Sequence, residues 1–255
     1  MKLKNKKDEK IQPIERIINK NTSFDTIETL KSIRTNIMFS IPKNDEGKVI
    51  VVTSSSPSEG KTTTCVNLSI TFAQMGAKVL LIDCDLRKAR VHRYLELERQ
   101  DGVTNVLCGF TDIDSAIKRN VRENLDVLTS GDIPPNPVEL FENEVFKHMI
   151  DQMKQEYEYI IIDTPPLAVV TDAAVIMKYS TGVVMIVHQN VTTFDLLDVA
   201  MDNIAKTGAR ILGVVMLGVE PKTKRYGYYR KMGYKYGYSY KNSWRYGDPT
   251  TTDQK

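Results

Sequence analysis

Residues Val49 to Thr64, with the sequence VIVVTSSSPSEGKTTT, decide the fold. The run Val49–Val52 is apolar and β-branched throughout, which is typical of a strand buried on both faces. A loop of small residues follows, and Gly60, Lys61 and Thr62 then open a helix. In a phosphate-binding loop, backbone N–H groups and the positive helix end surround the phosphates. The lysine reaches the outer phosphates and the hydroxyl binds Mg²⁺. The stretch therefore predicts a nucleoside triphosphate site.

The loop departs from the pattern G-x-x-x-x-G-K-[ST] because Ser55 stands where the first glycine is expected. A serine can hold that turn if its φ is negative. Taken alone, the stretch could also be a Gly-Lys pair at an ordinary helix start. Motifs elsewhere in the chain are needed to distinguish this alternative from a phosphate-binding loop.

Further apolar runs along the chain alternate with segments of helical pattern. Strands are expected at 78–83, 125–129, 159–163, 182–187 and 211–217. Helices are expected at 24–40 (with Ser23 as N-cap), 62–75, 91–98, 112–120, 137–155 (with Asn136 as N-cap), from 171 onward, and at 192–206. This alternation predicts an α/β fold with a mostly parallel sheet and helices on both faces.

Carboxylates stand where two of these strands end. Asp83 and Asp85 follow one strand in IDCDLRKAR, and Asp163 ends another in YIIIDTPP. In a parallel sheet, ligands gather at the carboxyl ends of the strands, so these side chains should face the same crevice as Lys61. A strand-terminal Asp in such a sheet typically holds Mg²⁺ directly or through water. An Asp-x-Asp surface turn is the alternative for the first pair.

Composition fits one α/β domain with tails. The chain has 255 residues and 41% hydrophobic content, and no apolar run approaches the roughly 20 residues of a membrane span. The first ten residues are lysine-rich with no apolar segment of signal-peptide type after them. The three cysteines lie in no metal-type spacing, so we expect a reduced, cytoplasmic protein.

The two ends of the chain differ from its middle. Residues 1–22 are expected to form a mobile arm, or a helix that orders only against a partner, before a domain at 23–220. Residues 221–255 carry nine Lys/Arg and two Asp/Glu and have almost no aliphatic side chains, so we expect a disordered tail. The tail holds eight of the twelve tyrosines: Tyr226, Tyr228, Tyr229, Tyr234, Tyr236, Tyr238, Tyr240 and Tyr246.

The motifs SSSPSEGKTT, LLIDCDLR and YIIIDTPP, together with this tail, resemble the bacterial tyrosine kinases that control capsular and extracellular polysaccharide synthesis in Gram-positive bacteria. In that family the motifs are Walker A, A′ and B of a P-loop NTPase-type domain. The resemblance implies an ATP-dependent protein-tyrosine kinase that uses Mg²⁺. It also implies autophosphorylation of the C-terminal tyrosines in trans, and regulation of polysaccharide synthesis and chain length.

The resemblance also implies roles for single residues. Lys61 would bind the β- and γ-phosphates, Thr62 would ligate Mg²⁺, and Asp83 would accept the tyrosine proton. Asp85 and Asp163 would support the metal and its waters, with Asp85 counted among the catalytic residues. The nucleotide would lie against the phosphate loop and the start of its helix: Pro57, Ser58, Glu59, Gly60, Lys61, Thr62 and Thr63.

Partners follow from the same resemblance. The family's interface motif E-x-x-R-x-x-R aligns with Glu28, Lys31 and Arg34, with Lys31 in place of an arginine, and implies a ring-type homo-oligomer. A membrane adaptor of the polysaccharide co-polymerase type, acting through its cytoplasmic tail, would hold the kinase at the inner face of the membrane, and a cognate tyrosine phosphatase is expected. Two further departures are Ser58, where the family has glycine, and Leu217, where it commonly has asparagine near the adenine.

Two other classes of protein fit parts of the pattern. Partitioning or positioning ATPases of the ParA/MinD type share the sheet and the strand-end Asp, but their signature lysine would align with Ser56. Their membrane-binding tails are amphipathic helices with an aliphatic face, which this tail lacks. A nucleic-acid module would explain tyrosines among lysines. It would leave the nucleotide site unexplained, so no nucleic-acid partner is expected.

Overall fold

The computed structural model describes residues 12–42 and 46–219. Its strands form one seven-stranded sheet in the order β3-β4-β2-β5-β1-β6-β7. All neighbouring strands are parallel except β3 and β4, so the predicted mostly parallel sheet is confirmed. The strands are β1 (Lys48–Ser54), β2 (Val79–Asp83), β3 (Lys118–Arg122), β4 (Leu125–Leu128), β5 (Tyr159–Asp163), β6 (Gly182–His188) and β7 (Ile211–Leu217).

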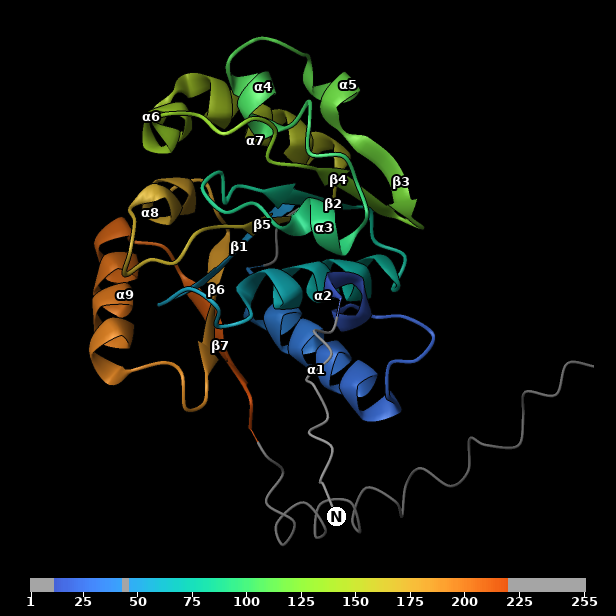
Figure 1. The fold of residues 1–255 in the computed structure, drawn as a ribbon, viewed down its shortest axis with the longest axis vertical. Helices are drawn as coiled ribbons and strands as arrows, with labels where there is room; N and C mark the ends of the chain where they lie inside the picture. Colours follow the sequence, from blue (N-terminus) through green and yellow to red (C-terminus); the bar gives the residue numbers. More distant parts are fainter. Residues whose placement is uncertain (1–11, 43–45, 220–255) are drawn as a thin grey trace, which may run out of the picture. The chain divides into compact units, whose positions relative to one another are not determined.

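Helices cover both faces of the sheet (Figure 1). They are η1 (Pro13–Arg16), α1 (Phe24–Ser40), α2 (Lys61–Ala73), α3 (Val91–Tyr94), α4 (Val103–Leu107), α5 (Ile113–Ala116), α6 (Pro137–Glu142), α7 (Glu144–Glu156), α8 (Asp172–Met177) and α9 (Phe194–Thr207). Among the described residues, no helix is both long enough and apolar enough to cross a membrane.

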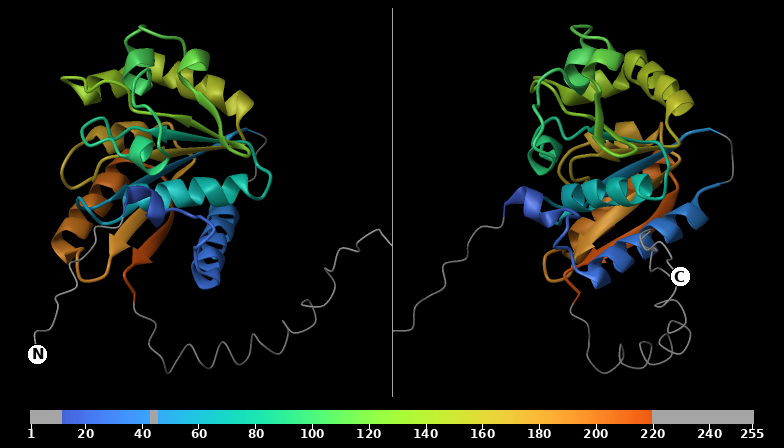
Figure 2. Two further views of the ribbon diagram at one scale, coloured as in Figure 1. Left: turned by 45° about the vertical axis from the view of Figure 1, so that its right-hand side comes forward. Right: turned by 90° about the vertical axis from the view of Figure 1, so that its right-hand side faces the viewer.

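The packing of the central strand β1 explains why its middle, Val49–Val52, is apolar at four successive positions. Val49 and Val51 belong to the hydrophobic cluster that also contains the buried side chains of α7, α8 and α9. Ile50 and Val52 belong to a second cluster, together with α1 and α2 on the opposite face. Figure 2 shows α1 and α2 packed on the same side of the sheet. Successive strand residues point to opposite faces, so a strand covered on both sides must be apolar at every position.

Strand register brings the acidic strand ends together. Strand β5 lies between β2 and β1, with Asp83 of β2 opposite Asp163 of β5. Asp163 is also opposite Val52 of β1, just before the loop that leads to α2. Motifs about 20 and 100 residues beyond the phosphate loop therefore meet at one edge of the sheet.

Residues 12–22 differ from the expected mobile arm. Ile17 and Ile18 are buried in the cluster beneath α2. The Ile18 amide donates to Asn67 Oδ1 of α2 at 2.8 Å, and Arg122 Nη1 of β3 donates to the Ile18 carbonyl at 2.9 Å. Two apolar side chains and these hydrogen bonds hold the segment on its own domain, so no partner is needed to order it.

The region between residues 91 and 130 was only partly predicted. The helix expected at 112–120 ends at Ala116, and β3 (Lys118–Arg122) follows and pairs antiparallel with β4. A buried group organises this turn: the Tyr157 hydroxyl donates to Asp126 Oδ2, and the Asn120 amide donates to Asp126 Oδ1, both at 2.7 Å. The short helix α4 was missed as well. Long-range contacts of this kind leave no local periodicity in the sequence.

The single helix expected at 137–155 is two helices. Asn143 is extended (φ −73°, ψ 144°), and its side chain accepts the Val145 amide as the N-cap of α7. A second capping residue inside the apolar pattern thus breaks the helix. The start at Pro137 is confirmed, but Asn136 makes no side-chain cap and instead donates to Glu139 Oε1 at 3.1 Å. At α1 the predicted cap is present, since Ser23 accepts the Thr26 amide.

We expect Ile17→Ala to lower the free energy of unfolding by about 2–4 kcal/mol, because a buried isoleucine leaves a cavity when truncated. Urea unfolding of the full chain measures this change. Ile14→Ala is the matched control, since Ile14 is only half-buried in the same segment and should cost less. Equal stability of the Ile17→Ala and wild-type chains would show that the segment is not docked in solution.

Candidate functional site

The loop between β1 and α2 has the backbone that a phosphate-binding loop requires. Gly60 is the N-cap of α2 and has φ +89°. A Cβ at this position would lie 2.6 Å from Leu217 Cδ1, the end of a side chain that can move, so glycine is needed here chiefly for its positive φ. The N-terminal turn of α2 then presents unpaired backbone N–H groups and the positive end of a helix dipole.

The serines of the loop behave differently from each other. Ser55, at the position of the missing first glycine, is not among the described residues with positive φ, which is the condition under which serine fits there. Ser58 has φ +68°, a left-handed conformation that favours glycine. The strain therefore lies at Ser58, one of the residues expected to contact the nucleotide.

Glu59 points into the loop and holds its shape. Its side chain is fully buried and accepts hydrogen bonds from the Ser55 hydroxyl at 2.8 Å and from the Ser56 amide at 2.8 Å. The hydroxyl of Thr192, from the segment between β6 and α9, also donates to it. Glu59 therefore braces the loop from behind, and the pocket described below is lined by its neighbours Ser58 and Gly60.

Lys61 lies between two of the predicted carboxylates. Its ammonium group is 2.8 Å from Asp85 Oδ2 and 3.6 Å from Asp163 Oδ1. Burial lowers the pKa of Lys61, but the negative charges of Asp163 and Asp85 outweigh burial, and the net pKa is raised. The lysine is therefore fully charged at neutral pH, and its ammonium group points toward Asp85 and Asp163.

Within the described part of the chain, Asp163 is hydrogen-bonded through one oxygen only, and its other oxygen, Oδ1, lies 3.6 Å from the Lys61 ammonium group. Its Oδ2 accepts the Thr62 hydroxyl at 2.7 Å, whereas its Oδ1 is buried without a hydrogen-bond partner among the described residues. Burial raises the pKa of Asp163. A buried carboxylate oxygen without a donor is costly unless something else, such as a cation, completes its surroundings.

Asp83 lies behind the loop that follows β2. Its Oδ1 accepts the Asp85 amide, and its Oδ2 accepts the amides of Arg90 and Val91, at 3.1–3.2 Å. Burial, followed by the charge of Asp163, raises the pKa of Asp83 to about 8. Asp83 does not line the pocket in this structure, whereas Asp85 does.

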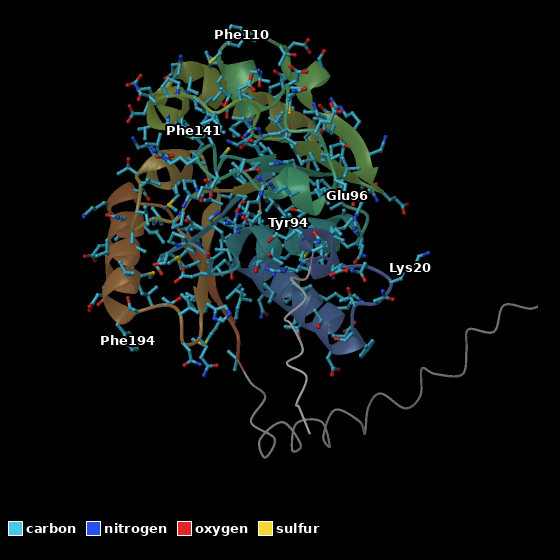
Figure 3. All side chains as sticks on the ribbon, viewed as in Figure 1. Lys20, Tyr94, Glu96, Phe110, Phe141 and Phe194 are labelled. Atoms are coloured by element: carbon cyan, nitrogen blue, oxygen red, sulfur yellow. The ribbon has the colours of Figure 1, made fainter. Side chains whose placement is uncertain are left out.

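A pocket opens in front of Lys61. The phosphate loop and the start of α2 form one side, through Pro57, Ser58, Gly60, Lys61, Thr62 and Thr63. The segment after β2 contributes a basic side with Arg87, Lys88 and Arg90, next to Asp85 and Tyr94. Tyr94, labelled on α3 in Figure 3, has its hydroxyl 2.9 Å from Thr63 Oγ1.

The third side of this pocket was not predicted from the sequence. Pro165, Pro166, Val169 and Val170, from the segment after β5, line it. The Pro-Pro pair was visible in YIIIDTPP as part of a motif, but nothing in the sequence showed which way it faces. The ion pair between Arg87 and the fully buried Asp172 was also missed, although Arg87 belongs to the LLIDCDLR motif.

The residues aligned with the interface motif lie on α1 and do not line the pocket. Glu28 and Lys31 form an exposed ion pair at 2.9 Å, one helical turn apart. Arg34 donates from Nη1 to the Thr71 carbonyl of α2 at 2.6 Å. The eight tail tyrosines lie outside the described residues.

The family comparison and the sequence relatives agree with this geometry. The model of the AAA domain family matches residues 47–209. Tyrosine-protein kinase YwqD of Bacillus subtilis is 39% identical over 203 residues, which cover 79% of this chain and 85% of YwqD.

Solved structures show the same fold. The chimerical protein CapA2B2 is 38% identical, with a TM-score of 0.71, over 74% of this chain and 83% of that chain. The cell division ATPase MinD of Pyrococcus furiosus is more distant, at 27% identity and a TM-score of 0.56 over 67% of this chain and 71% of that chain. The ParA/MinD alternative is therefore the weaker one. The chain binds nucleotide through an AAA-type domain and belongs to the family of bacterial tyrosine-protein kinases.

Proposed function

We propose that this kinase transfers the γ-phosphate of ATP to the C-terminal tyrosines of a neighbouring copy and thereby regulates capsular or extracellular polysaccharide synthesis. The observation that carries the transfer chemistry is the convergence of Lys61, Thr62, Asp85 and Asp163, from three strand ends, within hydrogen-bond or ion-pair distance. Phosphoryl transfer needs charge stabilisation and positioning more than covalent chemistry, and this group supplies both.

The donor atoms around Thr62 fit Mg²⁺. Carboxylate and hydroxyl oxygens are ligands that this ion accepts, and Asp163 Oδ1 is a buried oxygen that has no hydrogen-bond partner within residues 12–42 and 46–219. Among the described residues no group of three or more His, Cys, Asp or Glu is arranged to hold a metal alone. We infer that Thr62, with Asp85 and Asp163 directly or through water, would hold Mg²⁺ together with phosphate oxygens. Bound there, the ion would neutralise charge on those oxygens.

Asp83 is the proposed acceptor of the tyrosine proton. A phenol has a pKa near 10, and a carboxylate whose pKa is raised toward neutrality is a better base than an ordinary one. Asp83 is buried behind Asp85, so the loop after β2 must shift for its oxygen to reach the hydroxyl. With a pKa of about 8, Asp83 holds a proton at neutral pH in this structure, and a cation bound beside it would lower that pKa so that it could accept the phenol proton.

The partners are proposed from the resemblance. We propose a ring-type oligomer that uses the exposed pair Glu28 and Lys31 with Arg34, and a membrane adaptor that holds the kinase at the inner face of the membrane. CapA2B2, one of the similar structures, is a chimerical protein, which is consistent with a two-component arrangement. Each phosphate adds about −1.5 to −2 charges. Several phosphates would reverse the positive balance of the tail and weaken subunit association.

The transfer in trans has a direct test. A tagged Lys61→Met chain incubated with Mg·ATP should carry no phosphotyrosine, because it lacks the charge that stabilises the transferring group. With untagged wild-type chain added, the tagged chain should gain phosphate at Tyr226–Tyr246, read by mass spectrometry. Phosphate release without any modified tyrosine in the wild-type chain would favour an ATPase instead.

Because the buried carboxylates lie close together, we predict that the stability of the folded chain depends on pH in the absence of nucleotide and Mg²⁺. The pKa of Asp83 is about 8 when folded and about 3.9 when unfolded, so its proton contributes stability at low pH that is lost as the pH rises from about 4 through 8. The Asn side chain stays neutral at every pH. The Tm of Asp83→Asn relative to wild type should therefore be higher at about pH 9 than at about pH 5, because the loss of hydrogen bonds to the backbone amides is the same at both pH values.

Thermal unfolding of both chains at the two pH values checks this difference. Asp198→Asn, at an exposed acid of α9, is the matched control and should show no such trend. An equal Tm difference at both pH values would mean that Asp83 does not hold a proton in the folded chain.

The strained serine gives a test of the loop. Ser58→Gly should raise the free energy of unfolding by up to about 1 kcal/mol, because glycine adopts φ +68° without steric cost. Ser56→Gly is the control and should lower it by about 0.5–1 kcal/mol, since the φ of Ser56 is not positive. Urea titrations compare the two chains. Destabilisation by both substitutions would contradict the left-handed conformation of Ser58.

A further inference from the structure

We propose that the segment after β5, through Pro165, Pro166, Val169 and Val170, forms the binding wall for the ring of the acceptor tyrosine. The proposal rests on the tyrosine kinase activity above and deepens it by assigning the acceptor site. Within the part of the chain that the structure describes, these residues supply the apolar side of the pocket in front of Lys61.

The pocket has two chemically different sides. Lys61 and Asp85 form a charged end, with Arg87, Lys88 and Arg90 beside it. Two prolines and two valines face the same space. A tyrosine side chain has the same division, because its ring is apolar and its hydroxyl is polar. A ring against the prolines and valines would place the hydroxyl toward the charged end, where the phosphoryl group is transferred.

The wall is rigid because its backbone is tied to β1 and the phosphate loop. The Thr53 hydroxyl donates to the Pro165 carbonyl at 3.0 Å, and the Leu167 amide donates to the Ser54 carbonyl at 2.9 Å. The Ala168 amide donates to the Ser55 carbonyl at 3.2 Å. The prolines bring no N–H into the wall. The pocket side is therefore apolar without leaving a donor unpaired.

An ion pair fixes the far end of the same segment. Arg87 donates from Nε and Nη2 to the two carboxylate oxygens of Asp172, at 2.8 and 3.1 Å. Asp172 is fully buried at the start of α8, only two residues after Val170. This bidentate contact links the basic side of the pocket to the segment that carries the apolar wall.

Strand order separates this wall from the other side of the phosphate loop. Strand β5 lies between β1 and β2, and the segment that follows it is hydrogen-bonded to Ser54 and Ser55 at the start of the phosphate loop. Strands β6 and β7 lie on the opposite side of β1, and Leu217 of β7 approaches Gly60 from there. The wall thus follows β5, on the side of β1 from which the acidic residues Asp85 and Asp163 come.

When the ring of the acceptor tyrosine lies on this wall, its phenolic oxygen would form a bond to the γ-phosphorus. The bond from that phosphorus to the bridging oxygen breaks at the same time. ADP leaves with the bridging oxygen, and the phenol proton passes to a carboxylate, which we assign to Asp83. The wall takes no part in bond making and acts by orienting the ring.

Val169→Asp in the full chain tests the wall, because Val169 is 60% exposed and the variant should fold. The acceptor is a synthetic peptide with the sequence of residues 233–241, and its phosphorylation is followed by mass spectrometry. We expect the ratio of the KM for the peptide to the KM for ATP to be about tenfold higher than in the wild-type chain. The reason is that a charge replaces an apolar contact with the ring. Val169→Leu should keep the wild-type ratio.

Val145→Asp is the matched control, at a valine of α7 that is 42% exposed and does not line the pocket. A peptide KM that changes no more in Val169→Asp than in this control would overturn the proposal. A rise in the KM for ATP with the peptide KM unchanged would assign the wall to the nucleotide base and overturn it too. If the wild-type chain does not phosphorylate the peptide or its own tail, the kinase proposal itself fails.

Discussion

The contact on which the site depends is the ammonium group of Lys61 held between Asp85 and Asp163. It joins the segments that follow β1, β2 and β5, although these segments are far apart in the sequence. One positive charge faces three buried carboxylates, so the group carries excess negative charge. Burial, and then the charge of Asp163, raises the pKa of Asp83, and Asp163 Oδ1 has no hydrogen-bond donor among the described residues. The arrangement is therefore well suited to receive a cation together with phosphates, and costly without them.

The rest of the domain keeps this group in place. Parallel pairing in register sets Asp83 opposite Asp163, and the two hydrophobic clusters clamp the sheet from both faces. Buried Glu59 braces the phosphate loop, while Arg87 and Asp172 fix the segment after β5. The strained backbone at Ser58 is tolerated inside this frame. Rigid surroundings suit a reaction in which positioning and electrostatics do most of the work.

Much of the fold could be predicted because buried strands and amphipathic helices leave strong local patterns. The six apolar strands were predicted for this reason. The elements that were missed are short or set by distant contacts: β3 depends on Asp126 and Tyr157, and the break before α7 depends on one capping residue, Asn143. Residues 12–22 were expected to be part of a mobile arm or of a helix ordered by a partner, but Ile17 and Ile18 are buried against α2 of the same chain, which the sequence alone does not reveal.

The sequence by itself determined the chemistry of the site: a phosphate-binding loop with Lys61 and Thr62, and carboxylates at two strand ends. These follow from local motifs, because phosphate binding needs a particular order of residues within one turn. Only the tertiary structure decided which carboxylate contacts Lys61, that Asp83 lies behind Asp85, and that prolines and valines form the apolar side of the pocket. Strand order and burial fix those relations, and residues distant in the chain carry no local signal of either.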